Sequence, residues 1–246
     1  MNRKIFGLHA ARAVLEQAPE RVRTAWLDTG RRDRRLEALR QLLETQRISF
    51  ELADRKRLDR LAGNSHHQGI VMEVALPPEH DEDALERVLA EEGSPLFLVL
   101  DQVQDPHNLG ACLRTCDSVG AVGVIAPRDK TVGLTPAVCK VASGAAETVP
   151  LFRVTNLART LDRLKQAGLW IAGAAGEAKQ NAFEADLSGP LALVIGAEGQ
   201  GLRRLTREKC DFLIKLPMRG SVESLNLSVA AGVLLYEALR QREKLG

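Results

Sequence analysis

Residues 96–120 read LFLVLDQVQDPHNLGACLRTCDSVG, and this stretch predicts a buried β-strand followed by a helix. The run LFLVLD (96–101) is almost continuously apolar, which is typical of a strand in a parallel sheet that helices cover on both faces. The following segment, DPHNLGACLRTCDSVG (105–120), carries Asp, His, Asn, Arg and Cys side chains. A simple turn between a strand and a helix needs fewer reactive groups, so some of these are candidates for chemistry.

The alternation of apolar runs and helical patterns continues to the end of the chain. Further strands are predicted at GVIAP (123–127), TVPLFRV (148–154), LWIAGA (169–174), LALVIG (191–196) and FLIKLP (212–217). Aromatic residues make up only 4% of the sequence, so the core must be built from Leu, Val, Ile and Ala. This pattern predicts an α/β fold with a parallel sheet, which binds ligands at the carboxyl ends of its strands.

An acidic segment divides the chain. Residues 77–93 carry seven Asp and Glu against one Arg, between a Pro pair and a Gly-Ser-Pro sequence, and predict a linker with one short solvated helix. Residues 1–76 carry 15 Lys and Arg against 10 Asp and Glu, and residues 94–246 carry 18 against 15. We therefore expect a basic first domain at 1–76, an acidic linker at 77–93 and a second domain at 94–246.

The first domain is predicted to be a small α/β/α unit. Its expected strands are TAWLD (24–28), ISFELA (48–53) and GIVMEVA (69–75), which alternate with amphipathic helical patterns. The Arg-rich sequences GRRDRR (30–35) and DRKR (54–57) precede the second and third helices. They form either a solvated charged face or a surface that contacts nucleic-acid phosphates. The candidate RNA contacts are Arg31, Arg32, Arg34 and, in the second domain, Lys140.

The four Cys residues show neither a C-x-x-C pair nor a regular framework, which disfavours a zinc site and a disulfide scaffold. The pair His66-His67 is interpreted as a loop feature rather than a pair of metal ligands. The apolar run at the start of the chain is too short for a signal peptide, and no stretch approaches the ~20 apolar residues of a membrane span. We expect a soluble cytoplasmic protein without a metal.

The positions of residues 105–120 around the predicted helix separate core-facing from outward-facing side chains. A helix starting near Asn108 places Leu109, Cys112, Leu113 and Cys116 on one face, so both Cys are expected to be small buried hydrophobes rather than nucleophiles or metal ligands beside His107. Arg114 lies roughly 140° around the helix from Leu109 and points away from the core. Arg114 could bind an anion such as an RNA phosphate, and Asn108 could cap the helix, contact a ligand, or do both.

Two further loops follow predicted strands. In LVIGAEGQGLRR (193–204) the spacing G-x-x-G-x-G reverses the dinucleotide fingerprint, and no Lys-Ser/Thr follows to make a phosphate loop. Glu198 in this loop could favour the next helix through its charge, or could accept hydrogen bonds from a neighbouring Arg or Asn. In FLIKLPMRGSVESLNLSVAAGVLLYEAL (212–239), the final helix is apolar nearly all round and is expected to be buried. Its preceding polar residues, Ser221, Ser224, Asn226 and Ser228, would then need capping or ligand contacts.

Taken together, the segments DPHNLGACLRT, LVIGAEGQGLRR and IKLPMRGSVESLNLSVAAG resemble the three ordered motifs of the SpoU (TrmH-like) branch of the SPOUT RNA methyltransferases. This resemblance covers residues 94–246. The first domain, with KIFGLHA near its start and HHQGI near its end, resembles the ribosomal-protein-like substrate-binding domain of members that methylate a guanosine 2′-hydroxyl in bacterial 23S ribosomal RNA. The resemblance therefore spans nearly the whole chain.

The resemblance implies a deep trefoil knot in the second domain, S-adenosylmethionine bound in that knot, and a homodimer that pairs through the knot region. The residues it implies for the cofactor are Gly196, Ala197, Gly199, Gly201, Leu216, Met218 and Leu225. Those it implies for catalysis are Asn108, Arg114, Glu198, Ser224 and Asn226. The family proposal makes Arg114 the base; because a guanidinium group keeps its proton, binding of the adjacent phosphate is the alternative, with Asn108 and Glu198 orienting Arg114.

One local departure from the family pattern is Glu223, a carboxylate beside the third motif where a small or neutral residue is expected; an ion pair with Arg219 would neutralise it. The leading hypothesis is 2′-O-methylation of a guanosine in 23S ribosomal RNA with S-adenosylmethionine. Methylation of transfer RNA and a non-catalytic role in RNA binding during ribosome assembly remain alternatives. A nicotinamide dehydrogenase is a further alternative, which the reversed glycine spacing argues against.

Overall fold

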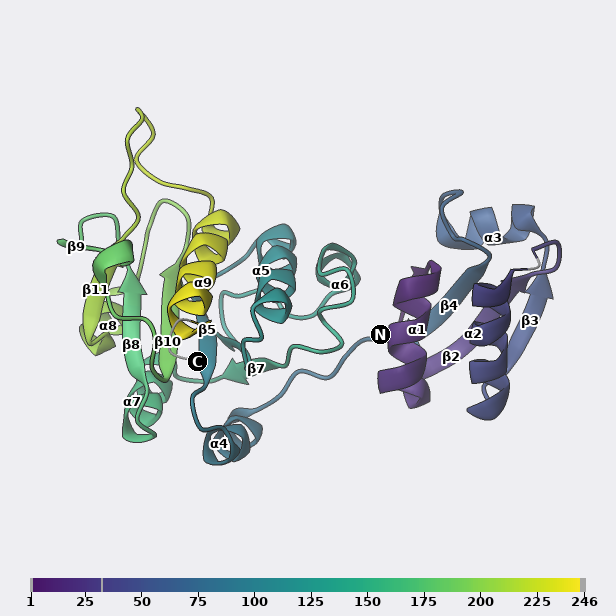
Figure 1. Ribbon diagram of the computed structural model, residues 1–246, viewed down its shortest axis with the longest axis horizontal. Helices are drawn as coiled ribbons and strands as arrows, with labels where there is room; N and C mark the ends of the chain where they lie inside the picture. The colour runs from purple at the N-terminus through teal and green to yellow at the C-terminus, as the bar shows by residue number, and fades with distance from the viewer. Residues whose placement is uncertain (1, 32, 244–246) are drawn as a thin grey trace. The chain divides into compact units, whose positions relative to one another are not determined.

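The computed structural model describes residues 2–31 and 33–243, and the chain divides into two compact units, residues 1–78 and 79–246 (Figure 1). The described residues of the first unit form a four-stranded sheet in the order β1-β4-β2-β3. Strands β2 and β3 are parallel and joined through a helix, and the other pairs are antiparallel. The strands are β1 (Asn2–Phe6), β2 (Val22–Asp28), β3 (Phe50–Ala53) and β4 (Ile70–Ala75).

Helices cover both faces of this first sheet. They are α1 (Leu8–Gln17), α2 (Arg34–Thr45) and α3 (Arg55–Ala62), with a short 3-10 turn at Pro19–Arg21. The leucines of α1 and α2 share one core with Leu27 of β2, whereas Leu58 of α3 shares a second core with Trp26. The three predicted strands and three helices are confirmed, and β1 is an additional strand that the sequence pattern did not predict.

The second unit is built on a parallel sheet, as the apolar runs predicted. Within its described residues the strand order is β7-β6-β5-β10-β8-β11-β9, and every pair is parallel. The strands are β5 (Leu96–Asp101), β6 (Gly123–Pro127), β7 (Leu151–Val154), β8 (Trp170–Ala174), β9 (Gln180–Asn181), β10 (Leu191–Gly196) and β11 (Phe212–Lys215). Its register places Asp101 at the end of β5 beside Gly196 at the end of β10.

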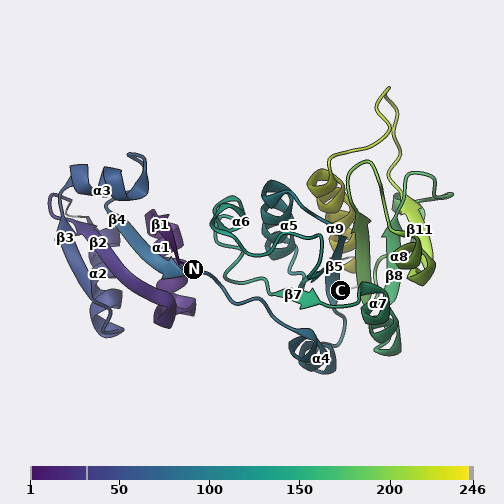
Figure 2. The ribbon, with the colours of Figure 1, turned by 180° about the vertical axis from the view of Figure 1, so that it is seen from behind.

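Helices lie on both faces of this sheet. Phe97 and Val99 of β5 share a core with the leucines of α7, whereas α5 and α9 pack side by side on the opposite face (Figures 1 and 2). Burying each of these large apolar side chains stabilises the fold by about 1.5–3 kcal/mol. The helices are α4 (Glu82–Glu91), α5 (Pro106–Ser118), α6 (Pro136–Val141), α7 (Leu157–Gln166), α8 (Arg204–Lys209) and α9 (Leu227–Glu243), with a 3-10 turn at Ala182–Glu184.

The acidic segment differs from the linker expected at 77–93, because from Glu79 onward it belongs to the second unit. Its helix α4 buries Leu85 in the core of that unit. Glu82 accepts a hydrogen bond from the backbone N–H of Thr155 at 2.8 Å. This hydrogen bond lowers the pKa of the Glu82 carboxyl, and the positive charges of Arg159 and Arg163 lower it further. One buried leucine and basic partners on α7 thus hold this segment against the second unit, although its composition is that of a solvated linker.

The final helix α9 also differs from its predicted burial. Leu227, Leu234 and Leu235 are buried, but Val229 and Tyr236 are 51% and 52% exposed in the single chain. With Val233 they form one apolar stripe, because the three residues are spaced i, i+4 and i+7. We refer to Val229, Val233 and Tyr236 as the α9 face. Helices of the described chain are all too short or too polar to cross a membrane.

Candidate active site

Three loops surround a cavity of about 450 Å³ at the carboxyl ends of β8, β10 and β11. The end of β10 and the loop after it contribute residues 195–202, and the end of β11 and the segment after it contribute residues between Ile214 and Leu227. All seven predicted cofactor residues line this cavity: Gly196, Ala197, Gly199, Gly201, Leu216, Met218 and Leu225. The structure therefore brings together residues that come from two separate sequence motifs. The trefoil knot that would thread these segments stays a prediction.

The loop after β10 folds tightly back on itself. Ala197 and Gly201 pair as an isolated antiparallel bridge, and Gly199 and Gly201 have φ angles of +75° and +67°. A Cβ atom on Gly196 would lie only 2.1 Å from the backbone of Gly201. No side chain larger than that of glycine fits there, and the tight turn exposes the loop backbone to the cavity.

Beside this cavity Asn108, Glu198 and Asn226 form a hydrogen-bonded cluster. The Asn226 side-chain amide donates to Glu198 Oε1 at 2.6 Å and to Asn108 Oδ1 at 3.0 Å. Asn108 Nδ2 donates to the same Glu198 oxygen at 3.3 Å, and the backbone N–H of Leu227 donates to it at 3.2 Å. One carboxylate oxygen thus joins α5, the glycine loop and the start of α9, and the prediction that Glu198 could accept from a neighbouring Asn is confirmed.

Asn226 also caps α9. Its Oδ1 accepts from the backbone N–H of Ser228 at 3.0 Å and from the Ser228 hydroxyl at 2.7 Å. The cap of α5 is Asp105, which accepts from the His107 N–H, so Asn108 is not the helix cap. Because Asp105 performs that task, the 7%-exposed Asn108 is available to the cluster.

An ion pair that the sequence analysis did not predict holds the glycine loop. Asp101 is fully buried at the end of β5 and accepts from the Arg203 backbone N–H at 3.1 Å and from Arg203 Nε at 2.6 Å. Arg203 follows the loop directly and occupies the N-cap position before α8. Since a buried carboxylate needs a partner, an acidic residue ending a buried strand was the available signal. The pair fixes the loop against β5.

Arg114 lies apart from this cluster. It is exposed on α5 and forms no hydrogen bond or ion pair with any described residue, so Asn108 and Glu198 do not orient it within one chain. Gly110, one turn earlier on α5, packs against Val138 and Val141 of α6. One turn later, Ser118 accepts a hydrogen bond from the Tyr236 hydroxyl at 3.2 Å, which places this part of α5 beside the α9 face.

The remaining candidates occupy exposed positions. Ser224 lines the cavity but, like Ser221, is exposed, so neither residue needs the capping or ligand contact that a buried position would require. Glu223 also lines the cavity, and it forms no ion pair with Arg219, although both residues are described. Lys140 is exposed on α6, Arg31 and Arg34 are exposed in the first unit, and Arg32 lies outside the described residues.

The cysteines of α5 are core residues, as their helical phase predicted. Cys112 and Cys116 are both fully buried. Burial raises the pKa of the Cys112 thiol to about 12 and raises that of Cys116 well above its usual value. With such raised pKa values the two thiols are unsuited to act as nucleophiles at neutral pH.

Throughout residues 2–31 and 33–243 no group of three or more His, Cys, Asp or Glu side chains could hold a metal ion.

Comparison with known proteins agrees with this geometry. Residues 95–236 match the model of the SpoU rRNA Methylase family, and residues 4–80 match the model for RNA 2′-O ribose methyltransferase substrate binding. The chain belongs to the SpoU methylase family. The resemblance inferred from the three motifs is thereby confirmed.

Relatives of this SpoU methylase match over nearly their whole length. The 23S rRNA (guanosine-2′-O-)-methyltransferase RlmB of Pseudomonas putida is 55% identical over 241 residues, covering 98% of this chain and 97% of the relative. The SpoU methyltransferase AviRb from Streptomyces viridochromogenes, solved in complex with the cofactor AdoMet, is 26% identical with a TM-score of 0.79, covering 99% and 91% of the two chains. The TrmH/SpoU tRNA modifying enzyme of A. aeolicus is 34% identical with a TM-score of 0.58, covering 67% of this chain and 85% of that chain.

The cavity of this SpoU methylase suits S-adenosylmethionine (AdoMet). Its volume lies within the range of roughly 300–1,000 Å³ that is usual for small-molecule sites. Ile195, Leu216 and Leu225 offer apolar surface for a purine, while the glycine loop offers backbone groups without a side chain in front of them. Glu198 brings a carboxylate that suits the cationic groups of the cofactor, whereas the Glu177 carboxylate at the same cavity pairs with Arg207. The volume of the cavity and the residues that line it therefore both fit S-adenosylmethionine.

Proposed function

We propose that this chain transfers a methyl group from S-adenosylmethionine to the ribose 2′-oxygen of a guanosine in 23S ribosomal RNA. The observation that carries the proposal is the cluster of Asn108, Glu198 and Asn226 at the rim of the cavity that all seven predicted cofactor residues line. The 55% identity with a guanosine-specific 23S RNA methyltransferase supports the substrate. An activity on ribosomal RNA in a bacterial cell implies the cytoplasm.

When bound, S-adenosylmethionine supplies a methyl group on a positively charged sulfur. Glu198 holds Asn108 and Asn226 in fixed positions through its shared oxygen, so the cluster at the rim of the cavity is ordered before the RNA binds. Arg114 binds the phosphate next to that ribose and stabilises the negative charge that develops on the 2′-oxygen as the hydroxyl proton passes to solvent. Ser224, which lines the cavity, donates a hydrogen bond to the RNA in this proposal.

The α9 face supports a homodimer. Val229, Val233 and Tyr236 are an exposed apolar stripe on a helix that is otherwise packed into the protein. A second copy that pairs along α9 would remove this stripe from water. The Tyr236 contact with Ser118 places Arg114, one turn away on α5, beside the same surface. A dimer through α9 therefore brings Arg114 to the interface, where it can reach RNA bound to the neighbouring protomer.

Introducing a charge on the α9 face should separate the protomers. The variant Val233→Asp is expected to sediment at the 26.9 kDa of one chain, whereas the unmodified protein sediments at twice this mass. A buried, unpaired carboxylate opposes association because it must lose its hydration. Leu205→Asp is the matched control, since Leu205 is a 53%-exposed apolar residue on α8, and it should leave the mass unchanged. An unmodified protein that is monomeric at all concentrations contradicts the dimer.

Loss of one RNA modification would test the proposed substrate. A strain that lacks this protein should lose a single 2′-O-methylguanosine from 23S RNA, and expression of the unmodified chain should restore it. Loss of a transfer RNA methyl group instead would favour the transfer RNA alternative, for which the A. aeolicus enzyme is the structural precedent. An unchanged modification pattern would favour a non-catalytic role in RNA binding.

A further inference from the structure

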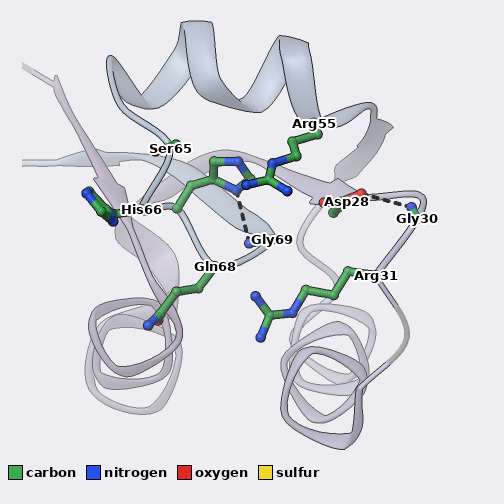
Figure 3. A pocket seen from close by; sticks show the side chains of 9 residues that line it. Asp28, Gly30, Arg31, Arg55, Ser65, His66, Gln68 and Gly69 are labelled. Atoms are coloured by element: carbon green, nitrogen blue, oxygen red, sulfur yellow. Dashed lines mark hydrogen bonds between the residues drawn. The ribbon is translucent and has the colours of Figure 1, made fainter.

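The first unit contains a pocket of about 620 Å³ that is separate from the methyltransferase site. It lies at the carboxyl ends of the parallel strands β2 and β3, where α2 and α3 begin, the usual ligand position for such a strand pair. Its walls are Asp28, Gly30, Arg31, Arg55 and the loop 65–69 that leads into β4. Figure 3 shows the Arg55 and Arg31 side chains extending from opposite walls toward Gly69.

The two arginines give this pocket positive charge. Arg55 at the first position of α3 is exposed and has no hydrogen bond or ion pair with any of the residues that the structure describes. Arg31 pairs with Asp33 and stays 40% exposed, and its side chain passes directly over Gly69. A Cβ atom on Gly69 would lie 2.9 Å from Arg31 Cδ, and the residue has a φ angle of +87°, so glycine is needed where the guanidinium enters the pocket.

Hydrogen bonds fix the loop that forms the opposite wall. The 3%-exposed His67 accepts the Gly69 N–H on Nδ1 at 3.0 Å, and its Nε2 lies 3.3 Å from Asp59 Oδ1. Gln68 Oε1 accepts the Leu8 N–H at 2.9 Å, which anchors the loop to α1. The pocket is therefore formed before any ligand binds, which lowers the entropy cost of binding.

We propose that this pocket holds one unpaired nucleotide of the RNA substrate, with its phosphate between Arg31 and Arg55. Two converging guanidinium groups match the oxygens of one phosphate, and the volume leaves room for the attached nucleoside. Asp28 disfavours a second phosphate but can accept a hydrogen bond from a ribose hydroxyl or a base N–H. Because a base within a helix cannot enter a pocket, the nucleotide belongs to a loop or a bulge. The inference rests on the proposed function for the identity of the RNA.

Substitution of Arg55 tests the pocket in the full-length protein. Arg55→Ala should weaken binding of a 23S RNA fragment about tenfold in fluorescence anisotropy and lower the salt dependence by about one phosphate contact. Arg31→Ala should act in the same direction, whereas the affinity for S-adenosylmethionine should not change in either variant. Arg57→Ala is the matched control on the same helix, because Arg57 pairs with Glu51 at 2.6 Å and does not line the pocket.

Three comparisons decide the nature of the ligand. Arg55→Ala should weaken binding of an RNA with an unpaired loop but not of its fully paired version. An equal loss of affinity for the two RNAs, or no loss of affinity for either, overturns the proposal. Guanosine monophosphate that binds the unmodified protein more tightly than the RNA fragment also overturns it, in favour of a free-nucleotide site. If methyl transfer is absent from the unmodified protein while Arg55→Ala still weakens loop RNA, the proposed function fails and the pocket assignment stands.

Discussion

Replacing Arg114 by alanine should lower methyl transfer to RNA about 100-fold or more, while S-adenosylmethionine binds with unchanged affinity. Arg114 is exposed on α5, outside the cavity, and contacts none of the described residues through a hydrogen bond or an ion pair. The folded chain therefore does not depend on its guanidinium group. An exposed cation that no described residue pairs with is suited to bind a phosphate of the RNA.

Single-turnover methyl transfer and calorimetric titration of S-adenosylmethionine measure the two expected effects of Arg114→Ala separately. Arg204→Ala is the control, because Arg204 is a 79%-exposed arginine whose partner is Glu208, and it should keep full activity. Arg114→Lys retains the charge but not the two-pronged donor geometry, so it should recover only part of the rate. Full activity of Arg114→Ala would contradict the role given to this residue.

Glu198→Ala should reduce both cofactor affinity and methyl transfer, the rate by about 100-fold. Its Oε1 atom accepts from Asn108, Asn226 and the Leu227 backbone, so its removal releases the glycine loop from α5 and α9, which stay joined by the hydrogen bond between Asn226 and Asn108. The free energy of unfolding should fall by only about 1 kcal/mol, since Glu198 is exposed and the released donors can bind water.

Glu198→Gln separates the charge of Glu198 from its hydrogen bonds, because the amide oxygen of glutamine still accepts hydrogen bonds but the side chain carries no negative charge. It should keep more activity than Glu198→Ala in the same titration and single-turnover measurements. Glu208→Ala, which removes a surface carboxylate paired with Arg204, should change neither quantity. Normal kinetics and normal cofactor affinity in Glu198→Ala would show that the hydrogen-bonded cluster has no part in the reaction.

The parallel sheet could be predicted from the sequence because its strands are buried on both faces. LFLVLD, GVIAP and LALVIG coincide with β5, β6 and β10, since in each of them nearly every side chain must be apolar. Helix α4 was predicted as part of a linker because a single buried leucine holds it among acidic residues. Strand β1 is stabilised by pairing with the distant β4, which no local pattern shows.

The site was predictable in its parts but not in all of its contacts. Helical phase correctly assigned Cys112 and Cys116 to the core, but the sequence left open whether Asn108 caps the helix or contacts a ligand; Asp105 is the cap and Asn108 joins the cluster. The link between Asp101 and Arg203 joins residues 102 positions apart, so only the register of β5 beside β10 brings them together. Arg114 lies in the same motif as Asn108, yet it forms no hydrogen bond or ion pair with any described residue, and Ser118, one turn later on α5, contacts Tyr236 of the α9 face.

The most direct test of the proposed reaction is transfer of a labelled methyl group from S-adenosylmethionine to 23S RNA that lacks its modifications. The unmodified protein should place one label on the 2′-oxygen of a single guanosine, identified by nuclease digestion and mass spectrometry. Transfer RNA under the same conditions should remain unlabelled. Absence of label from every RNA, or label on a base rather than a ribose, would contradict the proposed function.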